Sequence, residues 1–282
     1  MNTKTFLALA LAASGCAAQA SPVYLQPETV HAWEAYLRGA DARMQARLSS
    51  GKPFMWIDEA PDRRSRVRRG EIVIEPLVSR GAQTVPNGLV HHWIGAVFIP
   101  SSTLESLQNV VHDYGRYKEI YKPVVMDAHS VPTSTEGEEF SMTFQRHVLF
   151  VTAALQARYR VHDFDINAHR GYSLADAASV QEIEDYRRPS EHLLPPDTGS
   201  GFIWRIHSIS RYEERDGGVY LEMEAIALTR DIPGSLRWLV VPVVNHLSIN
   251  SLSATLSQTR QAVGEHIVTL ASRRKSSGKD SN

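Results

Sequence analysis

Two long alternating segments joined by a two-residue turn restrict the fold of this sequence more than any other feature. Residues 202–215 and 218–230 alternate apolar and polar side chains, and Asp216-Gly217 between them is typical of a tight β-hairpin turn. Pairing across such a turn places Arg211 opposite Glu222 on one face of the hairpin. We expect this face, which also carries Glu224, to be exposed to solvent, with Arg211 and Glu222 forming a surface ion pair.

The opposite face of the hairpin has large side chains at its ends and small ones between them. A solid core would more often fill the middle positions with Val, Ile or Leu, so this pattern predicts the wall of an apolar pocket. The residues assigned to this face are Trp204, Ile206, Ser208, Ser210 and Tyr212 from the first strand, and Leu221, Met223, Ala225 and Ala227 from the second.

The remaining segments predict an α+β domain. Residues 89–99 and 124–131 read as strands, and between them lie a capped helix from Leu104 and a short helix opened by Asp113 as its N-cap. Two segments, 140–144 and 151–161, alternate strictly, which predicts a sheet with one buried face. Residues 235–271 carry an apolar stripe at helical spacing, so a long C-terminal helix is expected to cover the sheet.

The N-terminus has the pattern of an export signal. Lys4 precedes a short apolar run over residues 6–13, and Ala18-Gln19-Ala20 fits a cleavage site that leaves Ser21 as the first mature residue. Cys16, the only cysteine, lies in a segment similar to a lipoprotein cleavage box. We therefore expect a periplasmic or secreted protein, with contact to a membrane surface if Cys16 is lipidated.

The order of strand, two short helices, antiparallel strands and long final helix resembles the START-like superfamily, also called SRPBCC or polyketide cyclase-like proteins. The most similar stretch runs from Gly95 to Pro100 and on through Leu104, Val110, Asp113-Tyr114, Tyr117, Tyr121 and Pro123. The second is Gly201 to Arg230 with the helix after it. The resemblance implies a helix-grip fold, in which a curved antiparallel sheet wraps around the long C-terminal helix.

The resemblance covers residues 88–272 and divides the chain. Residues 1–20 are expected to be a signal peptide, 21–87 an N-terminal extension with a helix and short strands, and 273–282 a disordered tail. Members of the superfamily bind lipids, sterols, polyketides or quinones between sheet and helix, and some catalyse cyclisation or dehydration. They share no single set of catalytic residues, so none is assigned here.

Face assignment alone selects the residues expected to line a pocket. They are Trp204, Ser208, Ser210, Tyr212, Met223 and Ala225 from the hairpin, Tyr159 from the middle strand, and Asn250 and Thr255 from the final helix as polar contacts. Ordinary core packing explains each of them equally well. The partner is expected to be a hydrophobic small molecule or lipid, and no nucleic acid, because the formal net charge is only -1.

Histidines and carboxylates give no clear catalytic or metal-binding pattern. The densest cluster is His162, Asp163, Asp165 and His169, and a strand would point the first two to opposite faces. His91 and His92 alternate faces, so one is expected to point inward as a core histidine. The sequence indicates no metal and no cofactor.

Three functions remain open. The first is a binding or carrier protein. The second is an enzyme of the cyclase or dehydratase type, which requires an inward-facing titratable group with a shifted pKa. The third is an interaction module whose groove is filled by Trp33, Phe54 or Trp56 of the extension.

Overall fold

The computed structural model describes residues 23–49, 51–132, 137–148, 151–232 and 234–277. The expected signal segment, its cleavage site and Cys16 lie outside these ranges. None of the helices within them combines the length and apolar character needed to cross a membrane.

Ten strands form one antiparallel sheet, as the alternation predicts. Its path is β2-β4-β12-β11-β8-β7-β6-β5, with β3 also paired to β4 and β9 to β8. The bounds are β2 Val73–Pro76, β3 Ala82–Val85, β4 Gly88–Pro100, β5 Val125–Val131, β6 Glu138–Val148, β7 Val151–Asn167, β8 Arg170–Glu184, β9 His192–Leu193, β11 Arg205–Arg215 and β12 Gly218–Arg230. Arg211 pairs with Glu222 across the β11–β12 hairpin, so the predicted register is confirmed. A separate pair joins β1 (Val23–Tyr24) to β10 (Thr198–Gly199).

Short helices connect β4 to β5. They are α3 (Leu104–Val111), η3 (Tyr114–Arg116) and α4 (Tyr117–Ile120). Thr103 and Ser106 form a capping box at the start of α3, which satisfies amides that the first turn leaves free. Asp113 occupies the N-cap position of η3 but makes no side-chain hydrogen bond there, so its predicted capping role is wrong.

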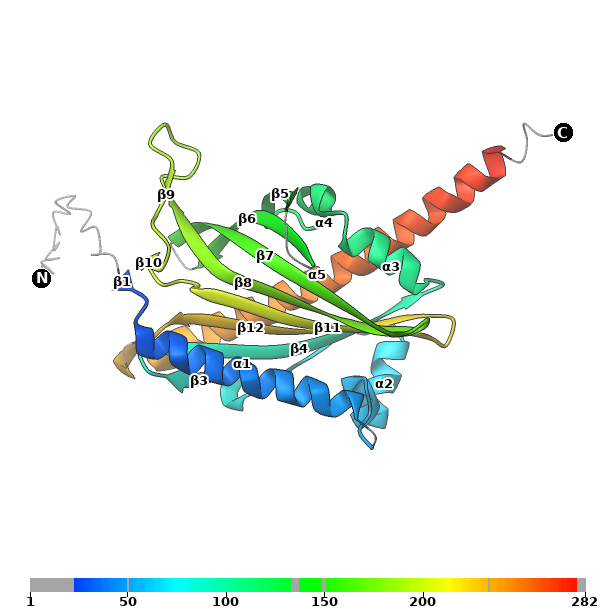
Figure 1. The fold of residues 1–282 in the computed structure, drawn as a ribbon, viewed down its shortest axis with the longest axis horizontal. Helices are drawn as coiled ribbons and strands as arrows, with labels where there is room; N and C mark the ends of the chain where they lie inside the picture. Colours follow the sequence, from blue (N-terminus) through cyan, green and yellow to red (C-terminus); the bar gives the residue numbers. More distant parts are fainter. Residues whose placement is uncertain (1–22, 50, 133–136, 149–150, 233, 278–282) are drawn as a thin grey trace, which may run out of the picture.

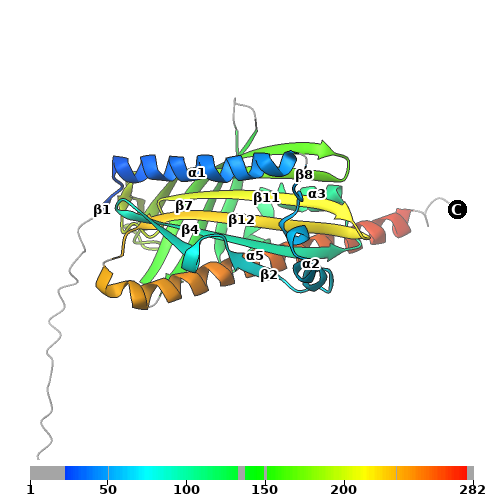
Figure 2. The same ribbon diagram turned by 90° about the horizontal axis from the view of Figure 1, so that it is seen from below.

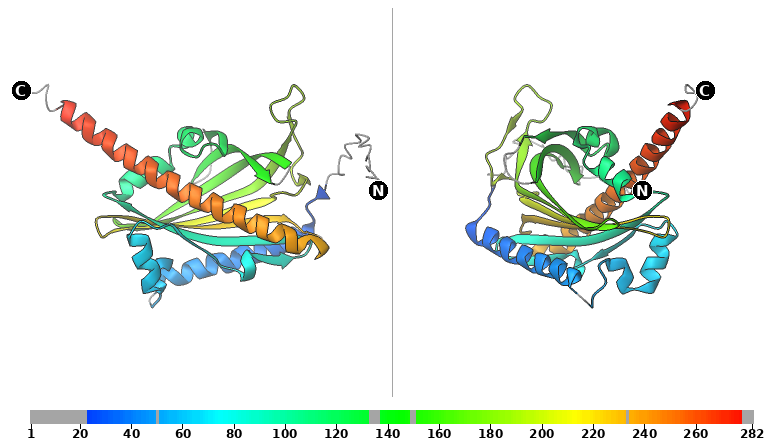
Figure 3. Two further views of the ribbon diagram at one scale, coloured as in Figure 1. Left: turned by 180° about the vertical axis from the view of Figure 1, so that it is seen from behind. Right: turned by 45° about the vertical axis from the view of Figure 1, so that its right-hand side comes forward.

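The long helix α5 (Gly234–Ser277) lies against one face of the curved sheet, which we call the concave face (Figure 1, Figure 3). It rests on β4 where Gly95 has no side chain, because a Cβ there would lie 2.7 Å from Leu256 Cδ1. This arrangement is the helix-grip fold expected from the sequence. The helix extends to Ser277, which includes the first residues of the expected tail.

The N-terminal extension covers the opposite face of the sheet, which we call the outer face. It contains α1 (Pro27–Leu48), η1 (Trp56–Glu59) and α2 (Pro61–Arg68). Figure 2 shows α1 and α5 on opposite sides of β4, β11 and β12. Trp33, Phe54 and Trp56 of the extension form one buried cluster with Ile209 and Ile226 of the hairpin.

Candidate functional site

The middle of the concave face consists of three cross-strand rows of mostly small side chains. Each row runs from β12 over β11 to β8, as the pairing register shows. The rows are Met223, Ser210 and Ser173; Ala225, Ser208 and Ala175; and Ala227, Ile206 and Ala177. Most of these side chains are half-buried although they face the interior of the curved sheet. Strand alternation therefore produces a sparsely filled surface where the sequence predicted a pocket wall.

Larger residues bound this surface at the end near the hairpin turn. Tyr212 and Leu221 are 4% and 3% exposed and belong to the cluster that packs under α3 and α5. Gly171 makes room for the Tyr212 ring, since a Cβ at position 171 would lie 2.6 Å from it. The predicted contrast between filled ends and an open middle is thus present at this end of the hairpin.

An aromatic wall borders the surface on the β6 and β7 side. The rings of Tyr114 and Phe140 stack with centroids 4.3 Å apart, and Phe140 stacks on Tyr159 at 4.8 Å. The Tyr114 hydroxyl donates to Glu138 at 2.7 Å, and burial raises the pKa of this phenol. Tyr159 therefore lies on the concave side as part of a stack.

The structure brings together only some of the residues selected from the sequence. Ser208, Ser210, Met223 and Ala225 share the concave face with Tyr212. Trp204 does not, because it precedes β11 and its ring packs in the outer-face cluster around Trp33. The face assignment of Trp204 was wrong because alternation holds only within the strand.

The two polar residues selected on α5 differ in exposure. Asn250 is exposed and its amide contacts His246 at 2.9 Å. Thr255 is half-buried one turn before Thr259, whose hydroxyl lies 3.0 Å from the Tyr121 hydroxyl. Leu252 faces the sheet, so Asn250, two residues earlier on the helix, points outward. The apolar stripe in the sequence did not show which of the polar residues between its members point toward the sheet.

A polar group lies at the rim of the concave side. His112, at the end of α3, has Nδ1 3.3 Å from Glu138 and Nε2 3.6 Å from Asp163. All three side chains are partly exposed, and the Glu138 side chain is 49% exposed. No set of three His, Cys, Asp or Glu side chains within the described ranges is arranged to hold a metal ion.

Arg211, Glu222 and Glu224 on the outer face of the hairpin are buried, which corrects the expected surface ion pair. Arg211 Nε donates to Glu222 at 3.0 Å, and one Arg211 Nη donates to Glu224 at 2.6 Å. Glu222 also accepts the backbone N–H groups of Trp56 at 2.9 Å and Ile57 at 2.8 Å. These amides belong to the extension. The residues that bury Glu222 therefore lie more than a hundred positions away in the sequence, which is why its burial was not predicted.

Two further side chains complete this buried network. His92 Nε2 lies 3.1 Å from Glu224, and its Nδ1 lies 2.8 Å from the Tyr36 hydroxyl of α1. Burial raises the pKa of the Glu222 carboxyl against the opposing effects of Arg211 and the two amides. Burial alone would also raise the pKa of Glu224, but the His92 hydrogen bond and the Arg211 charge together lower it to about 2.

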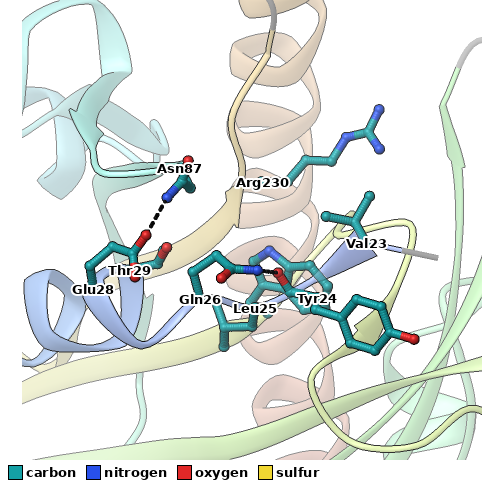
Figure 4. Close-up of a pocket in the computed structure, with 9 residues that line it drawn as sticks. Val23, Tyr24, Leu25, Gln26, Glu28, Thr29, Asn87 and Arg230 are labelled. Atoms are coloured by element: carbon teal, nitrogen blue, oxygen red, sulfur yellow. Dashed lines mark hydrogen bonds between the residues drawn. The ribbon is translucent and has the colours of Figure 1, made fainter. Parts of the chain in front are cut away.

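Because the extension packs on the outer face, its aromatic residues do not fill the concave face. The self-filled groove expected for an interaction module is therefore contradicted for Trp33, Phe54 and Trp56. A cleft of about 390 Å³ instead opens at the start of α1, between β1 and Arg230 (Figure 4). Its lining mixes polar and apolar side chains: Trp204 and Leu25 contribute to it, and Glu28 accepts a hydrogen bond from Asn87 at 2.8 Å, so it differs from the apolar pocket that was predicted.

Comparison with known proteins was informative only at the level of solved structures. No family model matches the sequence, and no curated protein matches it. Human StAR-related lipid transfer protein 5 aligns at 13% identity over 84% of this chain and 98% of that protein, with a TM-score of 0.42. The Zhui aromatase/cyclase from Streptomyces sp. R1128 aligns at 14% identity over 62% and 96%, with a TM-score of 0.39.

A STAR-related lipid transfer protein from Xanthomonas axonopodis also aligns, at 14% identity over 65% of this chain and 98% of its own, with a TM-score of 0.40. Two of these three proteins are StAR-related lipid transfer proteins. The similarity concerns the fold alone. The helix-grip assignment rests on the strand order and on the packing of α5 described above.

Proposed function

We propose that the protein is an exported binding or carrier protein that holds a hydrophobic small molecule or lipid against the concave face, beside α5. The observation that carries this proposal is the set of half-buried small side chains at Ser208, Ser210 and Ala225 on an inward face of the sheet. Apolar ligands are bound by such concave, mostly apolar surfaces with few polar groups.

The enzyme alternative has several candidate groups on the concave side: His91, and the phenols of Tyr212 and Tyr114, whose pKa values burial raises so that they stay protonated near neutral pH. His91 lies on the concave face, and burial lowers its pKa to about 4. A base with that pKa takes up protons poorly near neutral pH, where efficient general bases have pKa values close to the working pH. Binding therefore accounts for the site better than cyclisation or dehydration does.

Uptake of a neutral apolar dye, N-phenylnaphthylamine, tests the binding proposal directly. The wild-type protein is expected to enhance the dye fluorescence saturably, and Ala225→Phe, which fills the middle row, is expected to weaken binding at least roughly tenfold. Val268→Phe is the matched control, because Val268 is 66% exposed on α5. Equal binding by all three proteins, or by none of them, would contradict the proposal.

Export is a separate part of the proposal and has its own test. Expression of the full chain in a Gram-negative host is expected to yield periplasmic protein that begins at Ser21, as read by intact-mass spectrometry. Mass increase by a lipid group, abolished by Cys16→Ala, would identify the lipoprotein alternative. Cytoplasmic protein that retains residues 1–20 would exclude both forms of export.

A further inference from the structure

Glu182 places a carboxylate on the concave face of the sheet, where its neighbours are apolar. It pairs with Leu155 across β7 and β8, and Val180, two residues earlier on the same face, pairs with Ala157. These three neighbours all belong to the buried cluster that contains Tyr159. Since a carboxylate on such a surface costs free energy unless donors surround it, the groups that bind Glu182 are informative.

The donors come from the loop between β8 and β11. Glu182 accepts hydrogen bonds from three successive backbone N–H groups, those of Ser200 at 2.9 Å, Gly201 at 3.1 Å and Phe202 at 3.4 Å. The Ser200 hydroxyl donates to the same carboxylate at 2.7 Å. Gly199 and Gly201 have φ values of 130° and 72°, which residues with side chains rarely adopt, and this backbone turns the N–H groups toward one anion.

Residues 199–203 of this loop, which we call the gate segment, lie at the end of the small-residue rows that is farther from the hairpin turn. Phe202 and Ile203 pack against the same concave-side cluster as Ile206, a member of the last row. The Gly201 carbonyl accepts from the Arg230 N–H at 2.9 Å. The gate segment therefore connects β8 to the end of β12 at this end of the rows.

The N-terminal extension holds the gate segment from the other side. β1 pairs with β10, which places Tyr24 opposite Thr198, and the Leu25 N–H donates to the Asp197 carbonyl at 2.9 Å. The helix α1 begins two residues after Leu25 and covers the outer face. The same extension that buries the outer face thus also restrains the loop beside the concave face.

The two ends of the small-residue rows are held by different kinds of contact. At the hairpin-turn end, Tyr212 and Leu221 are buried in the cluster that packs under α3 and α5. In the gate segment, Ser200 is exposed, and Phe202 and Ile203 are only half-buried. Water can replace the hydrogen bonds of the gate segment at a small net cost, whereas opening the other end would expose buried apolar surface. The gate segment is therefore the end that opens more easily.

We propose that residues 199–203 form a gate through which a ligand reaches the concave face, and that Glu182 is the latch that keeps this gate closed. Opening transfers one carboxylate and the N–H groups that it binds to water, while the strands of the sheet stay paired. The pairing of β1 with β10 limits how far the gate segment can move. This inference rests on the proposed function and concerns how its ligand enters and leaves.

Stopped-flow measurement of N-phenylnaphthylamine binding tests the latch with Glu182→Gln. The glutamine has the same size, but it replaces one carboxylate oxygen by a hydrogen-bond donor and removes the charge. Association and dissociation are both expected to become roughly tenfold faster, the effect of about one hydrogen bond to a charged group, with a Kd within about threefold of wild type. Glu184→Gln is the matched control, because Glu184 is exposed on the same strand and contacts His192 outside the gate segment. It is expected to keep the wild-type rates.

A disulfide between β1 and β10 tests the same movement from the other side. Tyr24→Cys with Thr198→Cys, in a chain that also carries Cys16→Ser, joins two residues paired in antiparallel register. Such pairs have Cα atoms roughly 4.5–5.5 Å apart, which a disulfide can bridge. The oxidised protein is expected to bind the dye roughly tenfold more slowly than the same protein after reduction.

Thermal unfolding of each variant checks the fold, and the disulfide variant alone decides the outcome if Glu182→Gln does not fold. Wild-type rates in Glu182→Gln, or equal rates in the oxidised and reduced proteins, would overturn the gate while the proposed function stands. Faster dissociation with unchanged association would also overturn it, because Glu182 would then stabilise only the bound state. Absence of dye binding in every protein would instead reject the proposed function, and the gate with it.

Discussion

The two faces of the β11–β12 hairpin reverse the usual distribution of polar and apolar side chains. On the outer face, Arg211 and Glu222 are completely buried beneath the N-terminal extension. On the concave face, Ser208, Met223 and Ala225 are half-buried although they lie inside the curved sheet. The strands are the same, so the difference arises from what covers each face.

The comparison shows that the extension covers the outer face, whereas the small side chains of the concave face remain half-buried. Each carboxylate of the outer network has at least two partners, and Glu222 accepts two backbone amides of η1. Buried charges of this kind are tolerated because they are paired and hydrogen-bonded. Buried polar atoms without partners occur on both faces, among them one Nη of Arg211 on the outer face and Nδ1 of His91 on the concave face. Four measurements test this contrast, beginning with the largest expected effect.

Removing the single cation of the outer network is expected to cause the largest loss of stability. Arg211→Met leaves Glu222 and Glu224 buried without their guanidinium partner, which is expected to cost about 4 kcal/mol. The neighbouring Ser210→Ala lies on the concave face and is expected to change the free energy of unfolding by less than about 1 kcal/mol. Urea denaturation measures both. Similar losses for the two variants would show that the faces do not differ as proposed.

The alternation of the hairpin was sufficient to predict its register and most of its concave residues. The Asp216-Gly217 turn fixes which residues lie opposite each other, so Arg211 and Glu222 were paired correctly from the sequence. The helix-grip fold and the long final helix followed from the same periodicity and from the family resemblance, whereas the order of the strands within the sheet was not predicted.

The sequence of the hairpin does not show which segments cover each of its faces. Charged side chains on one face of a strand usually indicate solvent, and burial of Glu222 depends on amides at Trp56 and Ile57. The surroundings of His91 were missed for a similar reason. Its Nε2 lies 3.1 Å from Thr229 of β12, far along the chain, whereas the sequence showed only that His91 and His92 point to opposite faces.

A matched pair of alanines compares the packing of the two faces. Ala96 is 1% exposed on the outer face of β4, whereas Ala225 is half-buried on the concave face of the adjacent β12. Ala96→Val is expected to lower the free energy of unfolding by about 1–3 kcal/mol through overpacking. Ala225→Val is expected to cost less than about 0.5 kcal/mol, because the open surface accommodates two methyl groups. Chemical denaturation distinguishes these outcomes, and equal costs would indicate a filled concave face.

Mild acid is expected to destabilise the concave face through His91. Its pKa is lowered to about 4 in the folded protein from a usual value of 6.5, so the unfolded chain binds the proton more readily. The stability contribution is therefore complete above pH 6.5 and decreases as the pH falls toward 4, by roughly 2 kcal/mol at pH 5. Denaturation at pH 7.5 and 5 measures the change. His91→Phe is expected to lose about 2 kcal/mol less over this interval, and an unchanged loss would exclude His91 as its source.

The smallest effect concerns single tyrosine hydroxyls on the two faces. The Tyr36 hydroxyl lies 2.8 Å from His92 Nδ1 in the outer network, whereas the Tyr212 hydroxyl on the concave side lies 3.4 Å from Ser173. Tyr36→Phe leaves a buried imidazole nitrogen unpaired and is expected to cost about 1 kcal/mol, with a smaller loss for Tyr212→Phe. Unfolding curves recorded in parallel for both variants measure this difference. A larger loss from Tyr212→Phe would mean that the concave face depends more strongly on its polar contacts than the outer face does, which is the reverse of what the distances imply.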